Sequence, residues 1–149
     1  MDWSRIKEEI YFEDGSLRDI ITDTDDMSLK KWKLLCDFLQ ANYELRVLCD
    51  GNDMEVDFDF SLAEKMLFDE NHCYIATLCI CNVNLNLYFS FGHQRLEFDI
   101  SPNEVDSLDK HTAILGFMVQ LANVLQMSIK MTGENWPEPY LLKANPTTV

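Results

Sequence analysis

Basic residues are scarce in this chain. Its 149 residues include 12 Lys and Arg against 26 Asp and Glu, which gives a formal net charge of −14 at pH 7. Nucleic acid and anionic membranes repel a surface of this charge, so we expect direct binding to neither. A cationic partner is attracted to such a surface, and its association is accelerated.

Long apolar runs are also missing. No stretch approaches the roughly 18 apolar residues of a membrane span, and the start, Met1 to Arg5, lacks the pattern of a secretory signal. We therefore expect a cytoplasmic protein. The cysteines are odd in number and lie in apolar stretches, which favours buried, reduced thiols over a disulfide framework. They are Cys36, Cys49, Cys73, Cys79 and Cys81.

Patterns that would indicate catalysis or a cofactor are absent too. The histidines fall in a predicted loop, turn and helix start, where none is matched with a nucleophile. The thiols of Cys79 and Cys81 lie within an apolar strand, whereas zinc ligands are usually spaced by two or more residues among turn residues. The segment from Asp50 to Asp53 lacks the glycine and glutamate positions of an EF-hand. We expect no enzyme, no cofactor and no metal site.

Hydrophobic periodicity predicts a single α+β domain over residues 1–149. Apolar stripes at helical spacing predict helices over 28–41, with Ser28 as N-cap, and from between 102 and 108 to about 125. We expect an antiparallel sheet of about six to eight strands, formed by hairpins and a meander, with the two helices packed on one face. The predicted strands lie within 6–13, 17–22, 43–49, 53–60, 73–81, 83–91, 95–100 and 128–132, with a short helical turn in 61–69. The proline-rich tail from Trp136 to Tyr140 is expected to cross the surface.

One predicted strand carries an acidic face. From Asp53 to Phe60, carboxylates alternate with apolar residues, so Asp53, Glu55, Asp57 and Asp59 would share one face, roughly 6.6 Å apart. Lys65 is the only basic residue between Arg46 and Arg95, against eight Asp and Glu. A row of mutually repelling carboxylates fits a basic partner, although a charged edge strand that resists aggregation has the same pattern.

The following strand pattern supplies further candidates. Val83 to Phe91 alternates, with an apolar set predicted to face the core. Asn84, Asn86 and Tyr88 would face outward, and Tyr88 could be an aromatic anchor for a partner or an ordinary solvated tyrosine. We include all three in the predicted partner-binding set. Leu96, Phe98 and Ile100 are predicted to point inward, and Arg95, Glu97 and Asp99 outward.

The segment from Glu9 to Ile20, followed by a helix that contains Trp32, resembles the start of immunity proteins from bacterial polymorphic toxin and contact-dependent inhibition systems. Members of such families bind the toxic domain of their own effector, often over its active site. The resemblance covers about the first 40 residues and carries no site residues over.

These observations favour an immunity protein that neutralises a cognate, cationic toxin domain through an acidic surface, as a monomer or weak dimer. One alternative is an acidic chaperone of the type III secretion kind, although such chaperones typically begin with a helix and a hairpin is predicted here. A second alternative is a metal-dependent hydrolase that uses the carboxylates.

Overall fold

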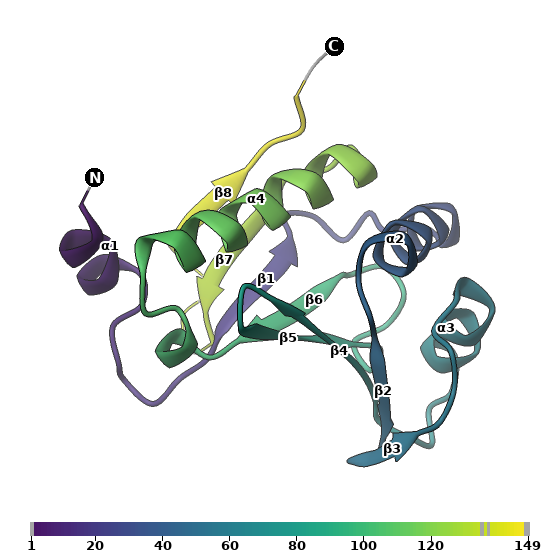
Figure 1. The fold of residues 1–149 in the computed structure, drawn as a ribbon. Helices are drawn as coiled ribbons and strands as arrows, with labels where there is room; N and C mark the ends of the chain where they lie inside the picture. Colours follow the sequence, from purple (N-terminus) through teal and green to yellow (C-terminus); the bar gives the residue numbers. More distant parts are fainter. Residues whose placement is uncertain (1, 135, 137, 148–149) are drawn as a thin grey trace.

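The computed structural model describes residues 2–134, 136 and 138–147. Within them the chain forms four α-helices and eight strands (Figure 1). The helices are α1 (Trp3–Glu9), α2 (Leu29–Asn42), α3 (Phe60–Leu67) and α4 (Leu108–Leu125), and a 3₁₀ turn covers Pro102–Glu104. The strands are β1 (Arg18–Thr22), β2 (Arg46–Cys49), β3 (Asn52–Met54), β4 (Tyr74–Ile80), β5 (Val83–Tyr88), β6 (Glu97–Ile100), β7 (Ile129–Gly133) and β8 (Leu142–Ala144). None of these helices is long and apolar enough to cross a membrane.

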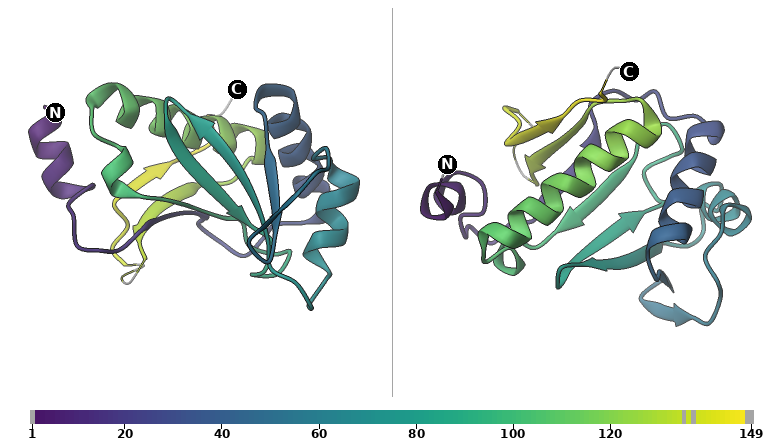
Figure 2. Two further views of the ribbon diagram at one scale, coloured as in Figure 1. Left: turned by 60° about the horizontal axis from the view of Figure 1, so that its bottom comes forward. Right: turned by 45° about the horizontal axis from the view of Figure 1, so that its top comes forward.

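All eight strands belong to one antiparallel sheet. Their order is β3-β2-β4-β5-β6-β1-β7-β8, and every neighbouring pair is antiparallel. Helices α2 and α4 lie on one face of this sheet (Figure 2). The predicted α+β class, strand number and placement of the helices are confirmed. The sheet is not a simple meander, because β1 pairs with both β6 and β7 and separates these later strands.

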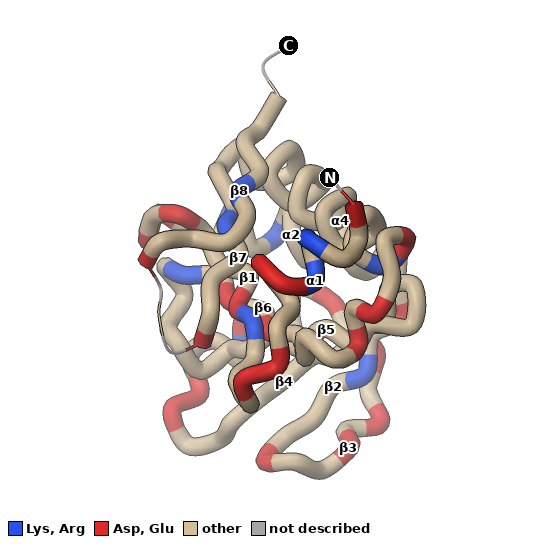
Figure 3. Tube along the Cα trace, turned by 90° about the vertical axis from the view of Figure 1, so that its left-hand side faces the viewer, with Lys and Arg blue, Asp and Glu red and all other residues tan. Residues whose placement is uncertain are grey.

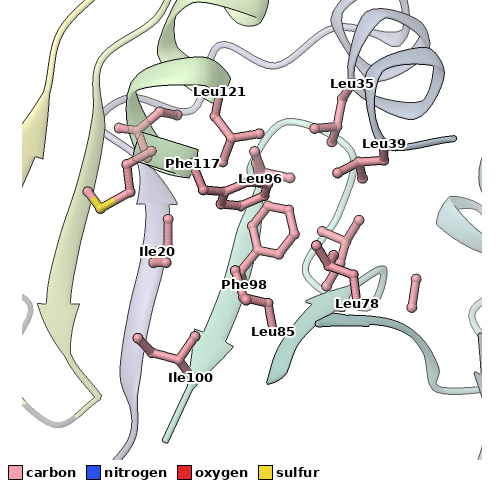
Figure 4. Close-up of a cluster of buried hydrophobic side chains, with 14 of the residues drawn as sticks. Ile20, Leu35, Leu39, Leu78, Leu85, Leu96, Phe98, Ile100, Phe117 and Leu121 are labelled. Atoms are coloured by element: carbon pink, nitrogen blue, oxygen red, sulfur yellow. The ribbon is translucent and has the colours of Figure 1, made fainter. Parts of the chain in front are cut away.

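The core lies between this sheet and the helices. Side chains of β1, β4, β5 and β6 point toward those of α2 and α4 (Figure 4). The rings of Phe98 and Phe117 meet edge to face with centroids 5.5 Å apart, a favoured geometry for aromatic pairs. Both predicted helices begin as expected, with Ser28 and Ser107 accepting hydrogen bonds from backbone N–H groups in the first turn.

The predicted first hairpin is wrong. Residues from Trp3 to Glu9 form α1, and Asp2 caps its N-terminus by accepting from the Arg5 backbone N–H. Ile6 and Ile10, four residues apart, are both buried, which is helical spacing. The turn after Gly15 leads into β1, whose partners lie far along the chain. The hairpin had been an argument against a secretion chaperone, and that argument no longer holds.

Arg18, the first residue of β1, links the segment that follows α1 to the sheet. Its side chain is completely buried, and its guanidinium donates hydrogen bonds to the carbonyls of Ile10 at 2.8 Å and Phe12 at 2.6 Å. The same group lies over the Phe12 ring, 4.6 Å from its centroid. A fork of several donors satisfies carbonyls that would otherwise be buried without partners.

The predicted acidic strand is also wrong beyond its first residues. Strand β3 ends at Met54, and residues 55–59 connect it to α3. Asp59 lies before the helix, where its carboxylate accepts from the Leu62 backbone N–H at 2.8 Å. Helix α3 occupies the region where a short helical turn was expected. An Asp side chain that accepts a hydrogen bond from the backbone N–H three residues later favours a helix N-cap over continued strand pairing.

Three details of burial differ from expectation. Phe91 is 53% exposed, because β5 ends at Tyr88 and no longer holds Phe91 against the core. Asp99 points away from the helices but is only 5% exposed. Of the cysteines, Cys36 is buried, Cys49 is half-buried and the rest are exposed. Burial raises the pKa of the Cys36 thiol to about 12.

Candidate functional site

The helix-free face of the sheet carries a row of polar side chains at its centre. Cross-strand register aligns Thr77 with Asn86, Asn86 with Asp99, and Asp99 with Asp19. These residues alternate along their strands with core residues such as Leu87, Phe98 and Ile20, so they project from the opposite face. Four separate strands therefore bring this row together.

Hydrogen bonds hold most of the row in place. Asp99 accepts from the Asn86 amide at 3.0 Å and from the Tyr88 hydroxyl at 2.5 Å, through different carboxylate oxygens. The Thr77 hydroxyl donates to the Asn86 carbonyl oxygen at 3.0 Å. We call Asp19, Asn86, Tyr88, Glu97 and Asp99 the sheet-face cluster. The three hydrogen bonds fix the orientation of Asn86 and Tyr88 around the carboxylate of Asp99.

Asp19 lies in an unfavourable electrostatic environment. It is directly opposite Asp99 in the β1–β6 ladder, where like charges destabilise a sheet. Burial, together with the nearby charges of Glu97, Asp99 and Glu134, raises the pKa of Asp19 to about 7. Burial also raises the pKa of Glu97, although Arg95 opposes this shift. Asp19 therefore holds its proton to a higher pH than an ordinary carboxyl does.

Arg95 offsets part of this negative charge, since its guanidinium opposes the rise in the pKa of both Asp19 and Glu97. Arg95 contacts Glu97, with 3.3 Å between nitrogen and oxygen. In the described part of the chain, neither Asp19 nor Asp99 forms an ion pair. Arg95 Nε is buried and has no hydrogen-bond partner among the residues that the structure describes. The cluster thus combines partly desolvated carboxylates with a shortage of cations.

Apolar groups border the cluster. The Tyr88 and Phe91 rings contact each other with centroids 5.6 Å apart, and more than half of Phe91 is exposed. Ile75, the cross-strand partner of Tyr88, is half-buried on the same face. Aromatic side chains beside buried polar groups are typical of the centres of protein interfaces.

Two of the predicted partner-binding residues, Asn86 and Tyr88, belong to the sheet-face cluster. Asn84 lies on the same strand but is held by Glu104, which accepts from both its backbone N–H at 2.9 Å and its amide at 3.0 Å. The sequence pattern also placed Glu97 and Asp99 on an outward face. It did not connect them with Asp19, because the pairing of β1 with β6 joins residues about eighty positions apart.

The four predicted acidic contacts do not share one strand face, because only Asp53 of the four lies in a strand. Asp53 makes a two-pronged ion pair with Arg46, at 2.8 and 2.6 Å, and Asp59 caps α3. Glu55 and Asp57 are exposed in the 55–59 connection, and Asp57 lines a surface hollow of about 490 Å³ with Glu44. Strand β3 ends at Met54, so the predicted alignment of the four carboxylates along one strand is wrong, while their role as partner contacts stays a prediction.

The sheet-face carboxylates are not among the closely grouped potential metal ligands of the described residues. Among the described residues, the one group of three or more His, Cys, Asp or Glu side chains with ligand atoms within 4.8 Å of one another is Cys49, Asp50 and His72. This group lies at the β2–β3 turn. It was not expected from the sequence, since His72 is more than twenty residues from Cys49.

No protein-family model, curated protein or solved structure matches this chain. The resemblance of residues 9–20 to immunity proteins therefore stays a prediction. In the structure, this segment comprises the end of α1, a loop and the start of β1.

Proposed function

We propose that this protein binds and neutralises a basic protein domain, as an immunity protein binds its toxin, and that the sheet-face cluster receives a cationic side chain of that partner. The observation that carries the proposal is the pairing of Asp19 with Asp99, without an ion pair to either in the described residues. Such an arrangement opposes folding. A guanidinium or ammonium group from a partner would relieve the repulsion.

The surroundings of the cluster favour a guanidinium. Asp99 already accepts from Asn86 and Tyr88, whereas no side-chain hydrogen bond of Asp19 occurs among the described residues. Glu97 lies one position along β6 from the buried Phe98, on the same face as Asp99. A planar guanidinium with several donors can reach two carboxylates, those of Asp19 and Glu97, at once. Its arrival would displace the Asp19 proton and leave the carboxylates paired.

The charge of the whole protein supports the same type of partner. Asp and Glu are spread over much of the chain and outnumber Lys and Arg (Figure 3). This excess raises the rate of encounter with a basic domain, while a few partly desolvated pairs determine how long the complex lasts. Exposed Phe91, beside Tyr88, offers apolar contact area next to the charged groups.

Binding fits the cluster better than acid–base catalysis. A catalytic pair of carboxylates needs oxygens that can reach a substrate, but both Asp99 oxygens accept hydrogen bonds from this chain. Asp99 is also 5% exposed. Its geometry is that of a group which positions Asn86 and Tyr88 and maintains the local negative potential.

The test compares two variants as bait and as antidote. Asp19→Asn with Glu97→Gln removes two charges from the sheet-face cluster and leaves Asp99 intact. Glu64→Gln with Asp109→Asn removes two charges from exposed positions of α3 and α4. Wild type and the helix variant should capture a basic domain from the producing cells at low ionic strength, and co-expression should prevent that domain from arresting growth.

The sheet-face variant should bind at least about tenfold more weakly, equivalent to about 1.4 kcal/mol, and protect poorly. Equal weakening by both variants would show that the interface lies elsewhere. If no basic domain is captured, or the bait is a strict dimer carrying an unfolded secreted segment, the immunity proposal fails. The second result would favour the chaperone alternative, with which the α1 start is compatible.

A further inference from the structure

The β2–β3 turn holds three side chains of different chemistry close together. Asp50 and Gly51 form the turn with positive φ angles of 49° and 84°, the left-handed region that tight hairpins use. The Asp50 backbone N–H donates to the Cys73 carbonyl at 2.8 Å, and the Cys73 N–H donates to Asp50 Oδ1 at 2.8 Å. These two bonds hold the turn against the residues that precede β4.

The three potential ligands converge at this junction. His72 Nδ1 lies 2.7 Å from Asp50 Oδ2, and Cys49 Sγ lies 3.9 Å from the same oxygen. Ligand atoms of Cys49, Asp50 and His72 all lie within 4.8 Å of one another. When several ligand atoms bind one metal ion at about 2.0–2.3 Å each, the distances between those atoms are similar to the distances between the three groups here. Only small side-chain movements would be needed to enclose an ion.

The core does not require these three groups. Asp50 and His72 are exposed, and Cys49 is half-buried.

Tyr74 lies beside the imidazole of His72. The Tyr74 hydroxyl donates to Asp69 at 2.7 Å, and the Tyr74 ring meets the His72 ring edge to face, with ring centroids 6.0 Å apart. The surroundings therefore limit the positions of the imidazole, as outer-shell contacts do around metal ligands.

We propose that Cys49, Asp50 and His72 form a zinc-binding site. A thiolate with an imidazole and a carboxylate matches the ligand preferences of Zn²⁺ and disfavours Ca²⁺ and Mg²⁺, which take oxygen ligands. Coordination releases the thiol proton of Cys49 to solvent and replaces the hydrogen bond between His72 and Asp50. Three protein ligands leave one tetrahedral position for water or for a residue of another protein.

This site differs from the one considered from the sequence. Cys79 and Cys81 lie at the end of β4 remote from His72, roughly 20 Å away at the rise of a strand. The inference also departs from the expectation that the protein binds no metal. It does not depend on the proposed binding of a basic domain.

The experiment titrates Zn²⁺ into chelator-treated, reduced full-length protein against a chromophoric zinc chelator. Wild type should bind one zinc per chain and melt at a higher temperature with zinc than without it. Cobalt substitution should give a thiolate-to-metal absorption band. Cys49→Ser and His72→Gln should each weaken zinc binding by more than about tenfold, the lower range for loss of even an outer-shell partner.

The matched control is Cys79→Ser with Cys81→Ser, which removes two exposed thiols and should leave zinc affinity and the cobalt band unchanged. Circular dichroism and melting without metal verify that each variant is folded. Absence of binding to the wild type, or wild-type affinity in both Cys49→Ser and His72→Gln, would overturn the proposal. So would loss of binding confined to the Cys79/Cys81 variant.

Discussion

Asp19 shows how one side chain can connect stability with recognition. Its carboxyl group faces Asp99 across the β1–β6 ladder, and burial is the largest cause of its raised pKa. The unfavourable energy of this position is present whenever the group is ionised and unpaired. A cationic partner would recover that energy on binding, so the same residue reduces the stability of the free protein and favours the complex.

Replacement of Asp19 by Asn should therefore stabilise the protein in a pH-dependent manner. The pKa of Asp in an unfolded chain is about 3.9, whereas the folded-state pKa of Asp19 is about 7. Between these values the folded state binds more protons than the unfolded state, so wild-type stability falls as pH rises through this window. The advantage of Asp19→Asn should grow from pH 5 to pH 8, by on the order of 1 kcal/mol after allowance for solvent screening.

Urea unfolding of both proteins at the two pH values measures this difference. Asp25→Asn, in the exposed loop after β1, removes the same charge from a solvated position and is the control. An advantage of Asp19→Asn that is the same at pH 5 and pH 8 would contradict the assignment of the raised pKa to this carboxyl.

Among the elements, α3 explains why the acidic pattern misled the sequence-based prediction. Alternation of carboxylates and apolar residues is expected of a strand, but the pattern from Glu55 to Asp59 lies in a connection that leads to a helix N-terminus. Phe58 is buried and Val56 is 43% exposed, so the apolar positions do not share one environment. The last carboxylate of the series satisfies a backbone donor of α3.

Asp59→Ala should consequently destabilise the protein by about 1 kcal/mol, the usual cost of losing an N-cap. Asp57→Asn, an exposed position two residues earlier, should leave the urea midpoint almost unchanged. Paired urea titrations of the two variants and wild type provide the comparison. Equal effects of the two substitutions would show that the Asp59 cap does not stabilise α3.

The elements that the sequence predicted well are those with long, regular patterns. Helix α4 contributes a buried stripe that includes Ile114, Phe117 and Leu121, and its periodicity is visible over about four turns. Helix α1 spans seven residues, too few for its period to be distinguished from alternation when Ile6 and Ile10 are its main apolar markers. Short elements depend on contacts elsewhere, here on Arg18 and the start of β1.

At the scale of the whole molecule, excess negative charge opposes the compact state. The ten ion pairs of the described residues leave many carboxylates unpaired, and several of these pairs are exposed and contribute little. Self-repulsion of a protein with a net charge of −14 acts over distances that added salt screens.

Raising sodium chloride from low to high ionic strength at pH 7 should therefore increase the melting temperature. A gain of about 1 kcal/mol would raise it by about 2–4 °C for a chain of this size. The experiment uses a chloride salt because sulfate stabilises proteins by exclusion from their surface, independently of charge screening. Near the sequence pI of 4.4 the increase should shrink. A melting temperature that falls with salt at pH 7 would mean that attractive pairs outweigh the repulsion.

Local sequence was sufficient for the helix stripes, the Ser28 N-cap, the outward alternation of Asn86 and Tyr88 and the net charge, because each depends on residues close together in the chain. The insertion of β1 between β6 and β7 came from contacts between distant segments. That insertion places Asp19 against Asp99, and a separate long-range contact places His72 beside Asp50. Strand register determines which distant residues come into contact, and register depends on how distant apolar faces pack together.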